Sequence, residues 1–235
     1  MNAHPAYKLK VHNLGKSFTL HNRGGVSVRG FSGIDFSLAC GQLLALSGPS
    51  GAGKSSILKT IYRTYLADSG SVRFRRGDGS EVDLVSCRES RVLDLRRREI
   101  GFVTQFLKIL PRVTALDTVA HPLIEIGTPE QEAREMAGEM LARLGIRKEL
   151  FHLSPLTFSG GEQQRINIAR GIIAPKELIL LDEPTASLDE KSAETVLEML
   201  EDLKRRKIAM IAIFHDKQKI DRVGDIRVHV ERNQQ

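Results

Sequence analysis

A glycine-rich segment of the chain reads Gly48-Pro49-Ser50-Gly51-Ala52-Gly53-Lys54-Ser55, with Ser56 directly after it. It matches the Walker A pattern, in which glycines let the backbone wrap around phosphates with its N–H groups turned inward. An apolar run precedes it and an amphipathic pattern follows, so it links a predicted strand to a helix N-terminus, which adds positive potential. We expect a nucleotide-binding loop in which Lys54 bridges the β- and γ-phosphates and Ser55 binds Mg²⁺.

A pair of carboxylates, Asp182 and Glu183, follows the apolar run Glu177–Leu181 and precedes Pro184. Ligands of open α/β sheets bind at the carboxyl ends of the strands. Alone, the pair is typical of solvated carboxylates that end a strand. With a phosphate-binding loop in the same chain, we expect Asp182 to hold Mg²⁺ and Glu183 to orient and deprotonate the attacking water.

A histidine, His215, follows another apolar run, Ile208–Phe214, so we expect it at the same edge of the sheet. There it could hydrogen-bond an oxygen of the γ-phosphate. A lone histidine is more often a packed residue, so this role depends on its neighbours.

The segment Phe158-Ser159-Gly160-Gly161-Glu162 opens a further predicted helix. Ser159 and Glu162 have the spacing of a capping box, which is a complete structural explanation. The functional alternative uses the same geometry, because two glycines at a helix start expose N–H groups to an anion. The pattern alone leaves both interpretations open.

Four apolar runs are predicted strands, and three of them are continuous, which is typical of strands buried on both faces of a parallel sheet. Amphipathic helices lie between them, so we predict an α/β fold with a doubly wound sheet. The predicted strands are Gln42–Ser47, Glu99–Thr104, Glu177–Leu181 and Ile208–Phe214, and the predicted helices include Ser55–Leu66, Pro129–Leu144 and one with the apolar stripe Ala193, Val196, Leu197, Leu200 and Leu203.

The helix predicted over Pro129–Leu144 has recognisable start and stop signals. Thr128 is the expected N-cap, Gln131 closes a capping box, and Gly145 ends the helix.

A single domain over residues 1–235 is expected, with an α/β core from about 1–104 and 162–235 and a helical subdomain from about 105–161. Tyr7–Phe36 alternates in polarity and has Gly24-Gly25 near its middle. It therefore predicts an antiparallel β layer with a hairpin.

Composition excludes several classes of protein. Among 235 residues, 41% are hydrophobic and 27% are charged, values that argue against disorder. The apolar runs are too short to span a membrane, and Met1–Lys10 has no apolar signal core, so we expect a cytoplasmic location without membrane insertion. Cys40 and Cys87 lack metal-ligand spacing and are expected to be packing residues in a reducing compartment.

A net charge of +6 allows an acidic partner, and arginines gather in one region. We favour a solvated surface, because acidic residues dilute the charge, and nucleic acid is not expected, because no aromatics interleave. Apolar residues after Gln105 are either a partner surface or the core of the helical subdomain. The arginines are Arg73, Arg75, Arg76, Arg88, Arg91, Arg96, Arg97 and Arg98, and the apolar residues are Phe106, Leu107, Ile109 and Leu110.

The ordered motifs, together with Gln105 and Ser187-Leu188-Asp189, resemble those of ABC-type ATPases over nearly the whole chain. The resemblance implies ATP and Mg²⁺ as ligands. It implies an adenine-stacking role for Phe18, and for Gln105 contacts to Mg²⁺ and the attacking water at the start of a segment that couples to partners. It also implies that Asp182 is the metal ligand.

Three further roles and a dimer follow from the same resemblance. Lys54 holds phosphates, Glu183 is the general base and His215 is the switch histidine. Two domains close head-to-tail around two ATP molecules, so that Ser159, Gly160 and Gly161 contact the γ-phosphate held by the opposite subunit. Asp189 belongs to the loop that crosses this interface. Phe158 and Glu162 replace the commoner Leu and Gln of this motif, which is compatible with ATP binding.

A narrower similarity is to the PhnL family, the ABC-type subunits of the bacterial phosphonate carbon–phosphorus lyase system. It implies an ATPase that docks on soluble core subunits and supports formation of ribose 1-phosphonate 5-triphosphate from ATP and phosphonate, as a subunit of that synthase. The segments that carry it are Phe18-Thr-Leu-His21, Gly25-Val26 within the insertion Asn22–Arg29, Gln105-Phe-Leu, Thr157–Gly171 and Ile213–Asp216.

Two other functions compete with this one. The first is the nucleotide-binding subunit of a membrane transporter, of lipoprotein-release or efflux type, with its permease on separate chains. The second is a DNA-repair or chromosome ATPase, which needs a long coiled-coil or zinc insertion that 235 residues do not accommodate.

Overall fold

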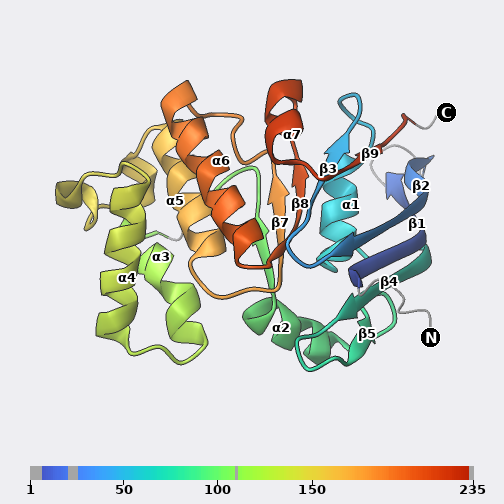
Figure 1. The fold of residues 1–235 in the computed structure, drawn as a ribbon, viewed down its shortest axis with the longest axis horizontal. Helices are drawn as coiled ribbons and strands as arrows, with labels where there is room; N and C mark the ends of the chain where they lie inside the picture. The colour runs from blue at the N-terminus through green and yellow to red at the C-terminus, as the bar shows by residue number, and fades with distance from the viewer. Residues whose placement is uncertain (1–6, 21–25, 109–110, 233–235) are drawn as a thin grey trace.

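The computed structural model describes residues 7–20, 26–108 and 111–232 (Figure 1). Its strands are β1 (Tyr7–Leu20), β2 (Val26–Ala39), β3 (Leu43–Ser47), β4 (Ser69–Arg75), β5 (Glu81–Asp83), β6 (Ile100–Val103), β7 (Leu178–Asp182), β8 (Ala209–Ile213) and β9 (Ile226–His229). Its helices are α1 (Lys54–Ile61), α2 (Glu89–Arg98), α3 (Ala115–Glu125), α4 (Glu130–Arg143), η2 (Lys148–Leu150), η3 (Pro155–Thr157), α5 (Gly160–Ile172), α6 (Glu190–Arg205) and α7 (Lys217–Val223).

A parallel sheet in the order β6-β7-β8-β3-β9 forms the centre of the fold. The four expected strands are confirmed, and β9 is added at one edge. Along β3, Leu43 and Ala45 belong to one hydrophobic core, whereas Leu44 and Leu46 belong to another. The apolar run is continuous because side chains on both faces of the sheet are buried.

Different layers cover the two faces of this sheet. Helices α3 to α7 contribute to the core on one face, and α1, α2 and the antiparallel sheet contribute to the core on the other. In Figure 1, α5 and α6 accordingly lie on the opposite side of β7 from α1. None of the helices described is long and apolar enough to cross a membrane.

The second sheet is antiparallel, in the order β2-β1-β4-β5. The expected β layer over Tyr7–Phe36 is thereby confirmed, and β1 pairs with β2 from Tyr7 opposite Ala39 onward. The predicted turn at Gly24-Gly25 lies outside the described residues. Strands β4 and β5 were not predicted, because their charged residues interrupt the apolar alternation.

Two helix boundaries differ from the expectation. Helix α1 ends at Ile61 rather than Leu66, because Arg63 takes a left-handed φ of 64° and turns the chain away. The capping box predicted for α4 is wrong, since Pro129 is the N-cap and makes no side-chain cap bond. Thr128 instead donates its N–H to the carbonyl of Leu123, in the turn that closes α3.

Other local predictions have mixed outcomes. Gly145 follows the end of α4 with a φ of 73°, as expected of a helix stop. Cys87 is half-buried, but Cys40 is exposed between β2 and β3. The packing role expected for Cys40 is therefore wrong.

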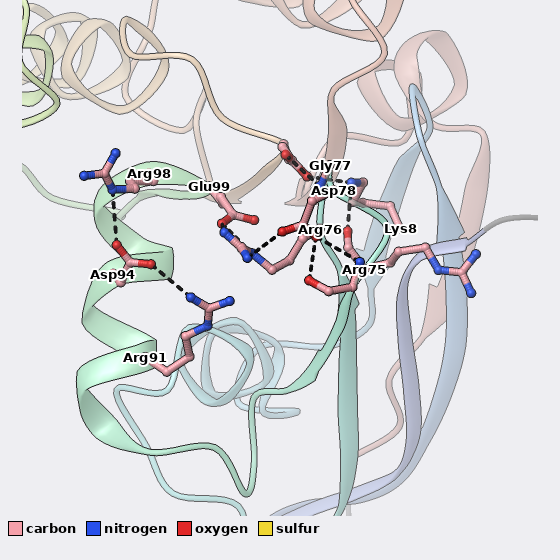
Figure 2. A network of polar contacts seen from close by, with 11 residues as sticks. Lys8, Arg75, Arg76, Gly77, Asp78, Arg91, Asp94, Arg98 and Glu99 are labelled. Atoms are coloured by element: carbon pink, nitrogen blue, oxygen red, sulfur yellow. Dashed lines mark hydrogen bonds and ion pairs between the residues drawn. The ribbon is translucent and has the colours of Figure 1, made fainter.

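A polar network joins the two sheets (Figure 2). The Nζ of Lys8 lies 2.6 Å from Oε2 of Glu177, and Oε1 of the same side chain accepts from the N–H of Gly77 at 3.1 Å. Arg76 binds the buried Glu99 through contacts of 2.8 and 2.6 Å. These contacts hold the antiparallel sheet against the starts of β6 and β7.

Candidate functional site

The glycine-rich loop connects β3 to α1, as its sequence predicts. Gly48 has a φ of 135°, and a Cβ there would lie 2.2 Å from the carbonyl oxygen of Val230. Gly53 has a φ of 93°, and its Cβ would lie 2.5 Å from the carbonyl oxygen of Gly30. Two of the glycines are thus required by backbone conformation and by close contact with the backbone of Gly30 in β2 and of Val230 just after β9.

Lys54 is buried, and its ammonium remains at the loop. Its Nζ donates to the carbonyls of Gly48 and Pro49, both at 2.8 Å. Carbonyl oxygens hold this cation without neutralising it, so the loop retains a positive charge that suits phosphate.

Ser55 and Asp182 meet across the sheet edge. The Oγ of Ser55 donates to Oδ1 of Asp182 at 2.8 Å. Asp182 is only 2% exposed, and this burial raises the pKa of its carboxyl, while the bond from Ser55 acts in the opposite direction. Hydroxyl and carboxylate oxygens are ligands that Mg²⁺ prefers, so the pair fits that ion. Within the described ranges, no three His, Cys, Asp or Glu side chains form a metal cluster of their own.

Two other predicted residues, His215 and Gln105, contact the carboxylate of Glu183. Its Oε1 lies 2.6 Å from Nε2 of His215, and its Oε2 accepts from Nε2 of Gln105 at 3.2 Å. Glu183 has a φ of 53°, which is uncommon for a residue with a side chain. Such strain is concentrated at functional sites, where the surrounding structure maintains it.

A residue that the motifs did not single out supports this turn. Gln164 of α5 is buried, and its Nε2 donates to the carbonyls of Pro184 at 3.3 Å and Glu183 at 3.5 Å. Its neighbour along the helix face, Asn167, donates to the carbonyl of Thr104. The sequence offered one signal that could have identified these residues, namely two amide side chains, Gln164 and Asn167, three positions apart on one helix.

The segment Ser159–Gly161 lies at the start of α5. The predicted capping box is confirmed, since Ser159 and Glu162 exchange bonds that include Ser159 N to Glu162 Oε2 at 3.0 Å. These bonds lower the pKa of Glu162. A Cβ on Gly161 would lie 3.1 Å from the carbonyl of Ser187, so this segment adjoins the 187–189 loop.

Asp189 is the N-cap of α6. It accepts from the N–H of Ser192 at 2.9 Å and from the hydroxyl of Ser192 at 2.8 Å, which lowers its pKa. Arg165 of α5 donates to the same hydroxyl at 2.8 Å. These bonds tie the loop to the helix that begins with the Ser159–Gly161 segment.

Phe18 lies near the glycine-rich loop, with Gly30 between its ring and Gly53 of the loop. Its ring packs edge-on against Tyr65 at 5.2 Å and covers Gly30, where a Cβ would lie 2.6 Å from the ring. The carbonyl of Gly30 contacts Gly53, as described above. An aromatic side chain therefore flanks the loop.

The sequence of this chain is similar to those of known ABC transporter ATP-binding proteins. The family described as ABC transporter matches residues 31–186. The lipoprotein-releasing system ATP-binding protein LolD of Legionella pneumophila is 33% identical over 91% of this chain and 92% of its own. An uncharacterized ABC transporter ATP-binding protein of Thermotoga maritima is 35% identical over 90% of this chain and 88% of its own.

A solved structure shares the fold. The ATP-binding cassette MJ0796, in a dimeric post-hydrolysis state bound to ADP and Pi, superimposes with a TM-score of 0.85 at 27% identity, covering 96% of this chain and 97% of that one. The resemblance to ABC-type ATPases is thereby confirmed, and this chain belongs to the ABC transporter ATP-binding family.

Proposed function

We propose that this chain is the ATP-hydrolysing subunit of a membrane transporter, held at the cytoplasmic face by membrane-spanning partners on separate chains. The names of its LolD relatives support this reading. The observation that supports ATP hydrolysis is that Glu183 contacts both His215 and Gln105, next to the Ser55–Asp182 pair.

ATP binds at the glycine-rich loop in this proposal. The N–H groups of Gly48 and of residues 50–56 and the ammonium of Lys54 bind the phosphates, and phosphate oxygens replace the carbonyls of Gly48 and Pro49 as partners of Lys54. The ring of Phe18, which flanks the loop, stacks on the adenine.

Ser55, Asp182 and Gln105 would hold Mg²⁺, and the oxygen ligands they offer fit that ion. A bound Mg²⁺ neutralises charge on the β- and γ-phosphates.

Glu183 accepts a proton from the attacking water through a carboxylate oxygen. Each of its oxygens has one partner, His215 or Gln105, and keeps a second lone pair that can accept from the water. The imidazole of His215 can also donate to an oxygen of the γ-phosphate.

Hydrolysis is expected in a dimer, and the dimeric cassette structures support this expectation. Ser159, Gly160 and Gly161 then contact the γ-phosphate bound to the partner copy, with Asp189 at the interface. The mostly helical part from about 105–161 is the insertion that carries coupling to the membrane partners.

The narrower similarity to PhnL supplies the second candidate, a subunit that docks on soluble carbon–phosphorus lyase proteins. It depends on short segments such as Thr157–Gly171. His21 and Gly25, which also carry it, lie outside the described residues. None of the relatives named above bears a name from that system, so the transporter is the better supported reading.

A tagged purification from the native host distinguishes the two. The Glu183→Gln variant is used with ATP to hold the complex, and Lys54→Ala is the matched control that should not bind nucleotide. Recovery from detergent-solubilised membranes with a multi-span protein supports the transporter. Recovery without detergent, together with carbon–phosphorus lyase subunits, contradicts it.

A further inference from the structure

A small hollow lies on the solvent face of the antiparallel sheet, where β1 and β4 run side by side (Figure 1). It has a volume of about 180 Å³ and is lined by Lys10, His12, Ser71 and Arg73. Lysine, arginine and serine side chains carry hydrogen-bond donors at neutral pH, and a histidine ring carries one or two. Among the residues that the structure describes, no carboxylate lines this hollow.

The register of the two strands places two cations opposite each other. Lys10 of β1 pairs with Arg73 of β4, and His12 pairs with Ser71 in the next row on the same face. Val11, between Lys10 and His12, is buried in the core, so its two neighbours point away from the core. Like charges directly opposite each other destabilise an antiparallel pair. An anion held between Lys10 and Arg73 would remove that repulsion.

Neighbouring carboxylates compensate these charges only in part. Glu81 of β5 lies 3.8 Å from the guanidinium of Arg73, but it also lies 3.9 Å from Arg75 and accepts from the hydroxyl of Tyr7. Over residues 7–20, 26–108 and 111–232, no carboxylate pairs with Lys10. The hollow therefore keeps a positive charge, which favours an anionic occupant.

The ring of His12 is oriented by a carboxylate on the neighbouring strand β2. Its Nδ1 lies 2.7 Å from Oδ1 of Asp35, and that oxygen also accepts from the N–H of Asn13 at 3.0 Å. The bond from Asn13, followed by the bond from His12, lowers the pKa of the Asp35 carboxyl, which favours its ionised form. Asp35 thus holds the imidazole by Nδ1, and a protonated ring donates to a ligand from Nε2.

The size and the donors of the hollow favour a small oxyanion. Its volume is below the roughly 300 Å³ at which pockets for organic ligands begin. The planar fork of an arginine can bind two oxygens of one phosphate, while a lysine adds a point charge. Donors on two strands approach the hollow from different directions, which suits a tetrahedral group better than a planar carboxylate.

We propose that this hollow binds a phosphate group, as inorganic phosphate or as a phosphate monoester, between Lys10 and Arg73, with the hydroxyl of Ser71 as a further donor. The site lies outside the glycine-rich loop, so its occupancy does not depend on ATP hydrolysis. Two sources share this chemistry, namely free phosphate and the headgroup of phosphatidic acid at a lipid surface.

The test is an NMR titration of the full chain in the presence of ADP, which occupies the glycine-rich loop. Backbone amide shifts of residues 10–12 and 71–73 report on the hollow, and those of residues 48–56 report separately on the loop. We expect sodium phosphate to shift the first group saturably, and sodium chloride at equal ionic strength to leave it unchanged. Sodium acetate should bind there at least about tenfold more weakly than phosphate.

Variants assign the binding to the two cations. Lys10→Gln and Arg73→Gln should each weaken phosphate binding at the hollow about tenfold. Lys10→Glu should abolish it, because the new carboxylate takes the place of the anion beside Arg73. The matched control is Arg206→Gln, an exposed arginine at the end of α6 that does not line the hollow and should bind phosphate as the unaltered chain does. The spectrum of each variant also shows whether it is folded.

Flotation with phosphatidylcholine vesicles that contain phosphatidic acid distinguishes the two sources. Vesicle binding that Lys10→Glu abolishes indicates the headgroup, whereas saturable shifts without vesicle binding indicate free phosphate. Shifts in phosphate that equal those in chloride, with no vesicle binding that depends on Lys10, overturn the proposal. So does an equal loss in Arg206→Gln, or a preference of the hollow for acetate or for duplex DNA.

Discussion

His215 Nε2 lies 2.6 Å from Glu183 Oε1, although the two residues follow different strands. The strands β7 and β8 are neighbours in register, with Asp182 opposite Ile213. Each side chain leaves its strand just past that pair, at the carboxyl edge of the sheet. The parallel register therefore creates the contact, and Gln105 completes it from the end of β6.

Removing the charge of Glu183 should separate binding from hydrolysis. We expect Glu183→Gln to bind ATP as the unaltered chain does but to hydrolyse it about a hundredfold more slowly, because an amide cannot accept the proton from water. Steady-state phosphate release and nucleotide binding measure the two effects. Glu190→Gln, at the exposed start of α6, is the control, and unchanged turnover in Glu183→Gln would refute the assigned role.

Two glycines of the loop should respond differently to alanine. Gly48→Ala combines a left-handed φ with a Cβ 2.2 Å from a backbone oxygen, so we expect a loss of about 3 kcal/mol or more in unfolding free energy, and weakened ATP binding. Gly51 also has a positive φ, of 78°, but open space around it, so Gly51→Ala should cost about 1 kcal/mol. Urea unfolding compares them, and equal losses would contradict the steric argument.

Acidification should weaken the cap of α5. Bonds from Ser159 lower the pKa of Glu162 below the ordinary glutamate value of about 4.3, so the folded state favours the ionised form. Its contribution to stability is therefore complete above that value and is lost as pH falls through the lowered pKa. Melting temperatures of the unaltered chain and Glu162→Gln should differ at neutral pH and converge in acid. A gap that is constant with pH would count against it.

The contact between Lys8 and Glu177 should contribute measurably to the free energy of unfolding, although the two residues lie far apart in the sequence. The Lys8 side chain is 8% exposed, so Lys8→Met leaves Glu177 without its cation at a half-buried site. We expect a loss of about 1–2 kcal/mol in unfolding free energy, measured in urea. Lys10→Met, on the exposed face of β1, should cost less than about 0.5 kcal/mol, and a similar loss in both variants would disprove the special role of Lys8.

Much of the fold and the site could be predicted because the deciding signals are local. The buried strands are continuous apolar runs, and the chemistry-bearing residues stand directly after them. Ser159 and Glu162 also carry their capping pattern within one turn. A single sequence is enough to predict such features, because they depend on residues that are neighbours along the chain.

The missed features depend on partners far away in the sequence. Thr128 looks like an N-cap, but the carbonyl of Leu123 on the preceding helix takes its N–H. Strands β4 and β5 carry many charges because one face of their sheet meets solvent, and a short β9 is defined by pairing with β3. Gln164 matters only because two carbonyls of the Glu183 turn lie over it.

Gln164 should therefore act as a positioning residue for Glu183. Its amide holds the carbonyls of Glu183 and Pro184, at a turn whose φ of 53° is unfavourable without support. Gln164→Met keeps the volume of the side chain but removes the donor. We expect kcat for ATP to fall about tenfold while KM stays within about twofold, because the loop that binds phosphate is untouched. Gln131→Met, on the exposed face of α4, should change neither value. If Gln164→Met instead raised KM at constant kcat, the amide would serve nucleotide binding rather than the orientation of the base.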